Sequence, residues 1–256
     1  MSEQNEENKP ELKEKNIFED LVGDILSLER GLPATFLTML KSPGRVIDSY
    51  FADEKQFVSP FKYTIFILAV VTLINTTFVD YEALMQAAAQ SGTNDIEQMN
   101  EDLKKLDEAT GLNFTGFMTA MKDVSVGLLT KYSQVFYILV MAPLLAFSSR
   151  LFFKKIKPKF THHYVMMLYT VSTYAVFTLF LIPLLANQSM IWIQTVLTSI
   201  IMMIFLMYTQ IKYLKLKGFD GYMMSFLSFL IGYILYFIGT FLVQIIGGII
   251  LVIVRG

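Results

Sequence analysis

Residues 222–254 read YMMSFLSFLIGYILYFIGTFLVQIIGGIILVIV, a run of 33 residues with no Asp, Glu, Lys, Arg or His. The hydrocarbon core of a bilayer is about 30 Å thick and takes about 20 helical residues to cross. The run is longer than one crossing and too short for two. It predicts one tilted or bent membrane helix, with Gly247-Gly248 as the expected bend. A span with a re-entrant end is the less favoured alternative.

Four more apolar stretches precede this one, and charged side chains are absent from the centres of all five. Arg150 lies close to the end of the second stretch. The chain has 256 residues, of which 54% are apolar, and a mean hydropathy of +0.50, too apolar for an ordinary soluble domain. Because backbone groups in lipid must be satisfied within the segment, the spans are expected to be helices. The sequence predicts an all-α polytopic membrane helix bundle of about five transmembrane helices, at 61–79, 134–153, 164–186, 190–211 and 222–254.

The distribution of Lys and Arg predicts the orientation of these spans. Basic residues gather before the first span, between the second and third, and between the fourth and fifth. Residues 80–133 instead carry four Lys against nine acidic residues, and the turn at 186–189 has no charge. We therefore expect a multi-pass membrane protein with a cytoplasmic N-terminus and an exterior C-terminus. The first apolar run begins too late for a signal peptide.

Two regions are expected outside the membrane domain, which covers 59–256. Residues 1–16 form a polar leader expected to be disordered, and 17–58 read as cytoplasmic amphipathic helices with a break at Gly31-Leu32-Pro33. These helices either lie on the membrane surface or pack beneath the bundle. Their acidic polar face favours packing on protein.

The insertion at 80–133 reads as exterior helices, with Gly111 where a helix stop is expected. A small cap that buries its own apolar stripes is favoured over a docking surface for an exterior partner.

Uncharged polar side chains inside the spans allow two interpretations. The residues concerned are Asn75, Thr173, Gln194 and Thr198. Hydrogen bonds between helices are the favoured interpretation. The alternative is a path for a small neutral or amphipathic solute, which uncharged groups suffice to line. Pro143 and Pro183 also lie within spans and each is expected to kink its helix.

Small residues recur on one face of the last span: Ser225, Gly232, Gly239 and Gly247. Small side chains let helices approach closely, so this face is predicted to pack on a neighbouring helix. The neighbour belongs either to the same chain or to a second copy, in a homo-oligomer.

Basic residues follow the second span and are candidates for contact with anionic lipid headgroups: Arg150, Lys154, Lys155, Lys157 and Lys159. His162 and His163 come directly after them. We expect solvated histidines rather than a capping, headgroup-binding or pH-sensitive role, and no metal site.

Sequence motifs of nucleotide-binding, hydrolytic and metalloprotease sites are absent. The spans also lack the buried Asp, Glu or His that intramembrane hydrolysis needs. We expect no enzyme activity, no cofactor and no nucleic-acid partner. The expected role is a non-enzymatic accessory or scaffolding protein acting through partner or lipid contacts; the alternative is a permease.

Two stretches resemble a known family. KSPGRVIDSY at 41–50, followed by SPFKY at 59–63, is similar to the Pro-Gly-x-x-Ile-x-x-Tyr and Pro-x-x-Tyr motifs of the uncharacterised bacterial membrane family DUF 3667. The stretch from His163 to Tyr169 resembles that family's His-containing segment at a span entrance. The resemblance covers roughly residues 35–185 and implies a multi-pass membrane topology without an assigned activity. The matching positions are Pro43, Gly44, Tyr50, Pro60 and His163. The chain lacks the Cys residues of the zinc ribbon that family members often carry.

Overall fold

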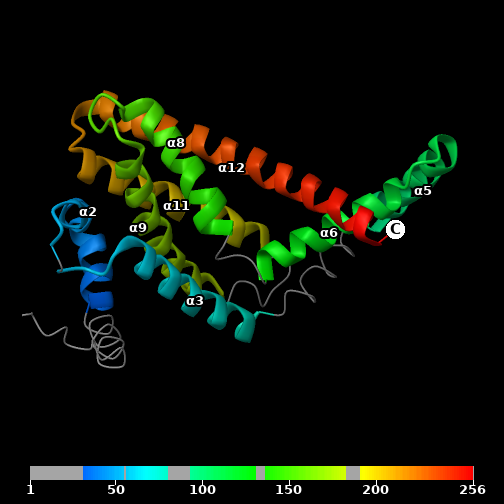
Figure 1. The fold of residues 1–256 in the computed structure, drawn as a ribbon, viewed down its shortest axis with the longest axis horizontal. Helices are drawn as coiled ribbons and strands as arrows, with labels where there is room; N and C mark the ends of the chain where they lie inside the picture. The colour runs from blue at the N-terminus through cyan, green and yellow to red at the C-terminus, as the bar shows by residue number, and fades with distance from the viewer. Residues whose placement is uncertain (1–30, 55, 80–92, 131–135, 183–190, 256) are drawn as a thin grey trace, which may run out of the picture.

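The structure, a computed structural model, describes residues 31–54, 56–79, 93–130, 136–182 and 191–255. Within these ranges the chain is helical and contains no strand (Figure 1). The predicted all-α bundle is therefore confirmed. The expectations for 1–30, 80–92 and Pro183 lie outside the described residues.

Four described helices are long and apolar enough to cross a bilayer. They are α3 (Pro60–Phe78), α9 (Phe160–Thr178), which continues into the 3-10 turn η2 (Leu179–Leu181), α11 (Ile191–Leu214) and α12 (Gly218–Arg255). The predicted second span is represented by a shorter apolar helix over Ile138–Phe153.

This shorter helix changes its geometry at Pro143. A π-helical turn, η1 (Tyr137–Met141), leads directly into α8 (Ala142–Phe153). Proline lacks the amide hydrogen that an α-helix needs, and its ring collides with the preceding turn. A wider π turn accommodates both problems, so the distortion expected at Pro143 takes the form of a π-bulge.

The last helix, α12, is one continuous element of 38 residues. At 1.5 Å per residue it extends about 57 Å, nearly twice the thickness of the hydrocarbon core. It remains helical through Gly247 and Gly248, so the predicted single long helix is confirmed and the re-entrant end is excluded. Its first half lies along α8 and its second half lies along α6 (Phe114–Thr130) (Figure 1).

The N-terminal helices pack against the bundle. Residues 31–41 are helical, and α2 (Pro43–Phe51) follows after one residue. Gly31, Leu32 and Pro33 form the first described turn of this helix, and the residues before them lie outside the described part of the chain, so the break expected there stays a prediction. Leu32, Thr35 and Met39 lie on one buried face of this helix.

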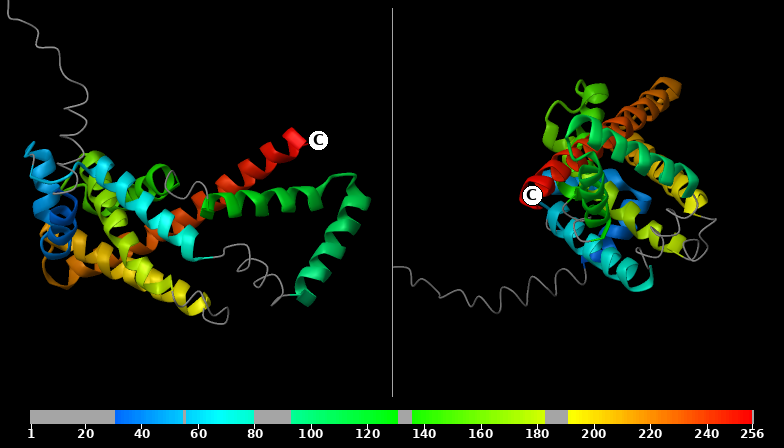
Figure 2. Two further views of the ribbon diagram at one scale, coloured as in Figure 1. Left: turned by 90° about the horizontal axis from the view of Figure 1, so that it is seen from below. Right: turned by 90° about the vertical axis from the view of Figure 1, so that its right-hand side faces the viewer.

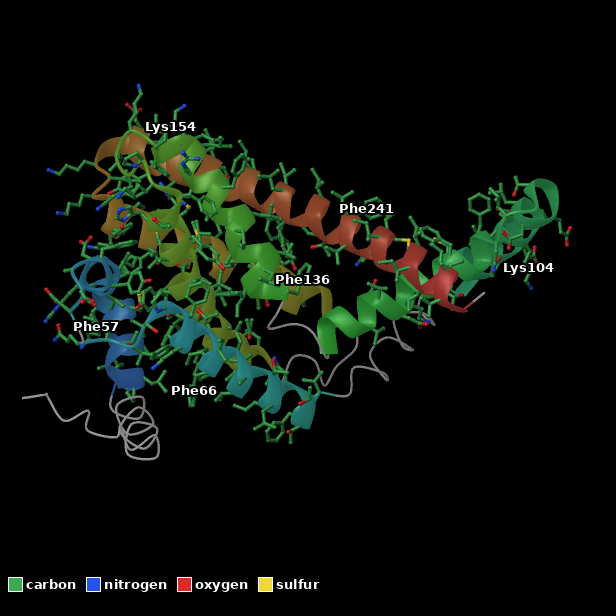
Figure 3. All side chains as sticks on the ribbon, viewed as in Figure 1. Phe57, Phe66, Lys104, Phe136, Lys154 and Phe241 are labelled. Atoms are coloured by element: carbon green, nitrogen blue, oxygen red, sulfur yellow. The ribbon has the colours of Figure 1, made fainter. Side chains whose placement is uncertain are left out.

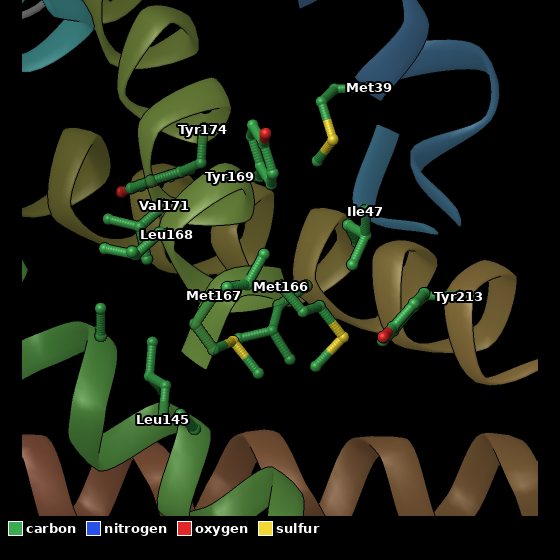
Figure 4. Close-up of a cluster of buried hydrophobic side chains, with 14 of the residues drawn as sticks. Met39, Ile47, Leu145, Met166, Met167, Leu168, Tyr169, Val171, Tyr174 and Tyr213 are labelled. Carbon is green, nitrogen blue, oxygen red and sulfur yellow. The ribbon is translucent and has the colours of Figure 1, made fainter. Parts of the chain in front are cut away.

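A shared hydrophobic core joins these N-terminal helices to α9 and α11. Met39 and Ile47 are fully buried and belong to one cluster with Tyr169 and Met166 of α9 and Tyr213 of α11 (Figure 4). The described part of the amphipathic segment thus packs on protein.

The insertion consists, where described, of α5 (Thr93–Thr110) and α6, which extend beyond the bundle beside the end of α12 (Figure 2). Gly111 adopts a left-handed φ of 69° and ends α5 as expected. The Asp107 carboxylate accepts hydrogen bonds from the backbone nitrogens of Phe114 (2.6 Å) and Thr115 (3.2 Å) at the start of α6. Hydrogen bonding from Thr115 and Phe114 holds the pKa of this carboxyl below its usual value.

The insertion does not bury all of its own apolar side chains. Leu106 on α5 is 46% exposed, and Leu112 in the α5–α6 connection is 60% exposed. The apolar stripe of α6 packs instead on α12, where Val124, Met121 and Phe117 lie against Gly247 and Gly248.

Candidate functional site

Basic side chains from three separate segments gather at one end of the bundle. Figure 3 labels Lys154 at this end, where many nitrogen-bearing side chains project outward. We call this surface the basic collar; it comprises Lys41, Arg45, Arg150, Lys154, Lys155, Lys157, Lys159, Lys212, Lys215 and Lys217. The acidic residues described in the same segments are fewer: Asp48, Asp53, Glu54 and Asp220. The collar therefore carries a net positive charge.

Close packing between α2 and α11 holds one side of the collar together. A Cβ added at Gly44 would lie 3.3 Å from the Lys212 carbonyl oxygen and 3.4 Å from Tyr213 Cα. The Tyr208 hydroxyl lies 2.9 and 3.0 Å from the carbonyl oxygens of Leu40 and Lys41. An added Cβ would require the α11 backbone to give by a few tenths of an ångström, so glycine favours this close approach of α2 to the end of α11.

Lys157 connects the loop after α8 to both neighbours. Its ammonium group lies 3.9 Å from an Asp48 oxygen on α2 and 5.1 Å from the ring centroid of Tyr213 on α11. The Tyr213 hydroxyl lies 2.9 Å from Nδ1 of His162, whose ring packs on Phe51 at a centroid distance of 3.9 Å. Lys157 thus belongs to the framework of the collar, and the surrounding cations form its outer surface.

His163 is completely buried, with 0% of its surface exposed. The expectation of a solvated residue is therefore wrong for His163. Its Nε2 lies 2.8 Å from the Lys157 carbonyl oxygen and its Nδ1 lies 2.9 Å from Ser149 Oγ. Because a carbonyl oxygen only accepts, Nε2 carries the proton, and Nδ1 of the neutral ring accepts from Ser149. The ring thereby joins α8, the following loop and α9.

Arg150 is exposed, and its Nε donates to the Pro158 carbonyl oxygen at 3.1 Å. Lys154, Lys155 and Lys159 are also exposed, and no ion pair is recorded for them among the described residues. These four cations are available to an anionic ligand or to lipid headgroups.

Thr173, a candidate for the solute path, lies inside a helix contact. It is 0% exposed, accepts from the Tyr63 hydroxyl at 3.0 Å and donates to the Tyr169 carbonyl oxygen at 2.8 Å. The preceding residue, Ser172, places its Oγ 2.7 Å from Thr64 Oγ1. These hydroxyls join α3 to α9.

Asn75, another candidate for that path, lies apart from Thr173. Asn75 is half-buried and lies about 18 Å further along α3 than Tyr63, at 1.5 Å per residue. Thr198 is half-buried on α11, and the side chain of Gln194 lies outside the described residues.

The small residues of α12 lie against other helices of the same chain. A Cβ at Gly232 would be 2.9 Å from Leu145 Cδ2, and one at Gly239 would be 2.7 Å from Leu144 Cδ1, both on α8. At Gly247 the nearest atom is Val124 Cγ2 of α6, at 2.9 Å. Ser225 faces α11 and donates to Gln210 Oε1 at 2.6 Å.

Several buried polar residues near the collar form hydrogen bonds between helices that no sequence pattern predicts. Gln210 donates to Ser228 Oγ at 3.0 Å, and Ser148 donates to the Ser228 carbonyl oxygen at 2.6 Å. All three side chains are at most 2% exposed. Their partners are distant in sequence, so spacing alone does not connect them. The basic residues at 41–45 and 212–217 were detectable as a pattern, although only as indicators of orientation.

The motif positions of the family resemblance lie in different parts of the fold. Pro43 is buried in α2, Gly44 lies against α11, and His163 is buried beside the loop after α8. Pro60 is buried at the first turn of α3, whereas Tyr50 is 40% exposed and packs edge-on against Phe51.

Comparisons with known proteins leave the resemblance as a prediction. No protein-family model, no curated protein and no solved structure matches the chain.

Proposed function

We propose that this chain is a non-enzymatic accessory or scaffolding protein of a bacterial cell (inner) membrane, which acts through partner or lipid contacts at its basic collar. In this proposal the collar and the N-terminus face the cytoplasm, and α5 and the end of α12 lie on the exterior side. The excess of Lys and Arg at the collar supports this orientation, because basic residues favour the cytoplasmic side of a membrane. The resemblance to DUF 3667 supports a bacterial source.

The collar is the observation that carries the proposal. Its cations come from three segments that buried contacts hold in one arrangement, through Gly44, Tyr213 and His163. Near an anionic surface each such cation contributes about 1 kcal/mol of attraction. A preorganised basic surface of this kind suits a scaffold for lipids or for an acidic partner protein.

The permease alternative has weaker support in the described residues. Thr173, which it would place on a solute path, is enclosed by Tyr63 and Tyr169. Packing accounts for this residue without a solute.

Gentle solubilisation of membranes into polymer-bounded lipid discs tests the proposal. We expect the purified protein to retain specific lipids or a partner protein, identified by mass spectrometry. A triple variant, Lys155→Gln, Lys159→Gln and Lys217→Gln, is expected to lose most of what the native chain retains. The matched control is Lys104→Gln with Lys105→Gln on α5, two exposed cations remote from the collar. A native chain that carries neither a partner nor a selected lipid would contradict the proposal.

A further inference from the structure

The outward face of α8 combines two chemistries in one stripe. Phe147, Arg150, Leu151 and Lys154 follow at spacings of three, one and three residues, so they lie on the same side of the helix. All four are exposed, with Phe147 at 47% and Leu151 at 51%. The opposite side is buried against α9 and α12, through Leu145, Ala146, Ser148, Ser149 and Phe153.

We infer that this face binds one anionic phospholipid, with the phosphate on Arg150 and Lys154 and the acyl chains along Phe147 and Leu151. The inference rests on the proposed function and deepens it by naming the ligand. From Phe147 to Lys154 the helix rises about 10 Å, enough to cross the polar interface of about 5–8 Å between the headgroup surface and the hydrocarbon core.

Arg150 is held in position for this task. Its Nε donates to the Pro158 carbonyl oxygen at 3.1 Å, which fixes the guanidinium group against the loop after α8. The other nitrogens of this group have no recorded hydrogen bond within the described residues. A planar guanidinium with two free amino groups donates two parallel hydrogen bonds to a phosphate.

A lipid fits this face better than an acidic protein segment does. A segment in water would bind the cations but would leave Phe147 and Leu151 to be covered by something else. A phospholipid offers a negative phosphate to the two cations and apolar chains to Phe147 and Leu151, in the order in which the stripe presents these side chains. The adjacent Lys155 and Ile156 are also exposed and continue the same boundary between polar and apolar surface.

Native mass spectrometry of the detergent-purified full chain tests the inference by titration with dioleoylphosphatidylglycerol and, separately, dioleoylphosphatidylcholine. We expect the native chain to prefer the anionic lipid. Arg150→Gln with Lys154→Gln should weaken binding of phosphatidylglycerol about 30-fold, the effect of two interfacial cations, and leave phosphatidylcholine binding unchanged. Phe147→Ser with Leu151→Ser should weaken the binding of both lipids. Because all four side chains are exposed, the variants should fold. If the double variant does not fold, the single change Lys154→Gln replaces it and should weaken phosphatidylglycerol binding about fivefold.

Three outcomes would overturn the inference. The first is equal binding of the two lipids by the native chain. The second is an equal loss in the α5 control, Lys104→Gln with Lys105→Gln. The third is competition by millimolar inorganic phosphate that removes the anionic lipid completely, since this would indicate a site for a free phosphate ion. If a partner protein still copurifies while lipid selectivity is absent, this inference fails and the proposed function stands.

Discussion

At the residue scale, His163 is the most informative side chain of the described chain. A single buried imidazole accepts from Ser149 on α8 and donates to the Lys157 carbonyl oxygen in the loop, while its own backbone belongs to α9. Replacement by alanine leaves a cavity and removes the hydrogen-bond partner of the buried Ser149 hydroxyl and of the half-buried Lys157 carbonyl oxygen. We expect His163→Ala to lower the free energy of unfolding by about 3 kcal/mol, measured by denaturation in detergent micelles.

The neighbouring histidine provides the control. His162 is half-buried and has one side-chain hydrogen bond, to the Tyr213 hydroxyl. His162→Ala should therefore cost about 1 kcal/mol. A loss for His162→Ala that equals or exceeds that for His163→Ala would contradict the structural role assigned to His163.

The same pair shows the limit of sequence reasoning at this scale. Two adjacent histidines that follow Lys157 and Lys159 are predicted from the local charge to be exposed to solvent, and the local sequence gives no sign that one of them is buried. The burial of His163 depends on Ser149, which a chain reversal brings alongside it. Spacing along one helix cannot reveal a partner on another. Thr173 differs, because a hydroxyl within a span predicts a helix contact without naming Tyr63 as its partner.

At the scale of elements, the attachment of α2 to α11 depends on Gly44. Valine at this position would place its side chain against the Lys212 carbonyl oxygen and the Tyr213 backbone, which cannot rotate away. We expect Gly44→Val to destabilise the protein by about 2 kcal/mol and to separate the N-terminal helices from the bundle. Faster proteolysis within residues 31–58, at unchanged cleavage elsewhere, would report this separation.

Gly239→Ala is the matched control. Its added Cβ meets Leu144 Cδ1, the far end of a flexible side chain, which can move aside. Proteolysis of the N-terminal helices should then match that of the native chain. If proteolysis of residues 31–58 is as slow in the Gly44→Val variant as in the native chain, the attachment of α2 does not depend on its close approach to α11.

Hydropathy predicted the long helices well because it reports a property of each element alone. It predicted α12 as one long helix and placed both ends of α3 and α11 and the start of α9 within four residues; the predicted end of the third span at 186 lies outside the described residues. It could not predict that a π turn would accommodate Pro143. The break expected at Gly31-Leu32-Pro33 stays a prediction, because the residues before 31 lie outside the described part of the chain.

At the scale of the whole molecule, polar groups are divided between two tasks. Buried hydroxyls and amides bond one another and join helices, as Tyr63 with Thr173 and Ser225 with Gln210 show. Exposed cations gather at the collar, where three distant segments meet. Composition predicted the membrane and the charge bias, whereas the union of 41–45, 150–159 and 212–217 into one surface required the tertiary structure.

Photo-crosslinking in intact membranes tests the proposed role of the collar most directly. A photoreactive amino acid replaces Lys154 or Lys217 in separate variants, and Lys104 on α5 in the control. We expect Lys154 and Lys217 to form adducts with anionic lipid or with a recurrent partner protein, and Lys104 to form neither. Absence of collar adducts, or the same adducts from Lys104, would contradict a scaffold that acts through its basic collar.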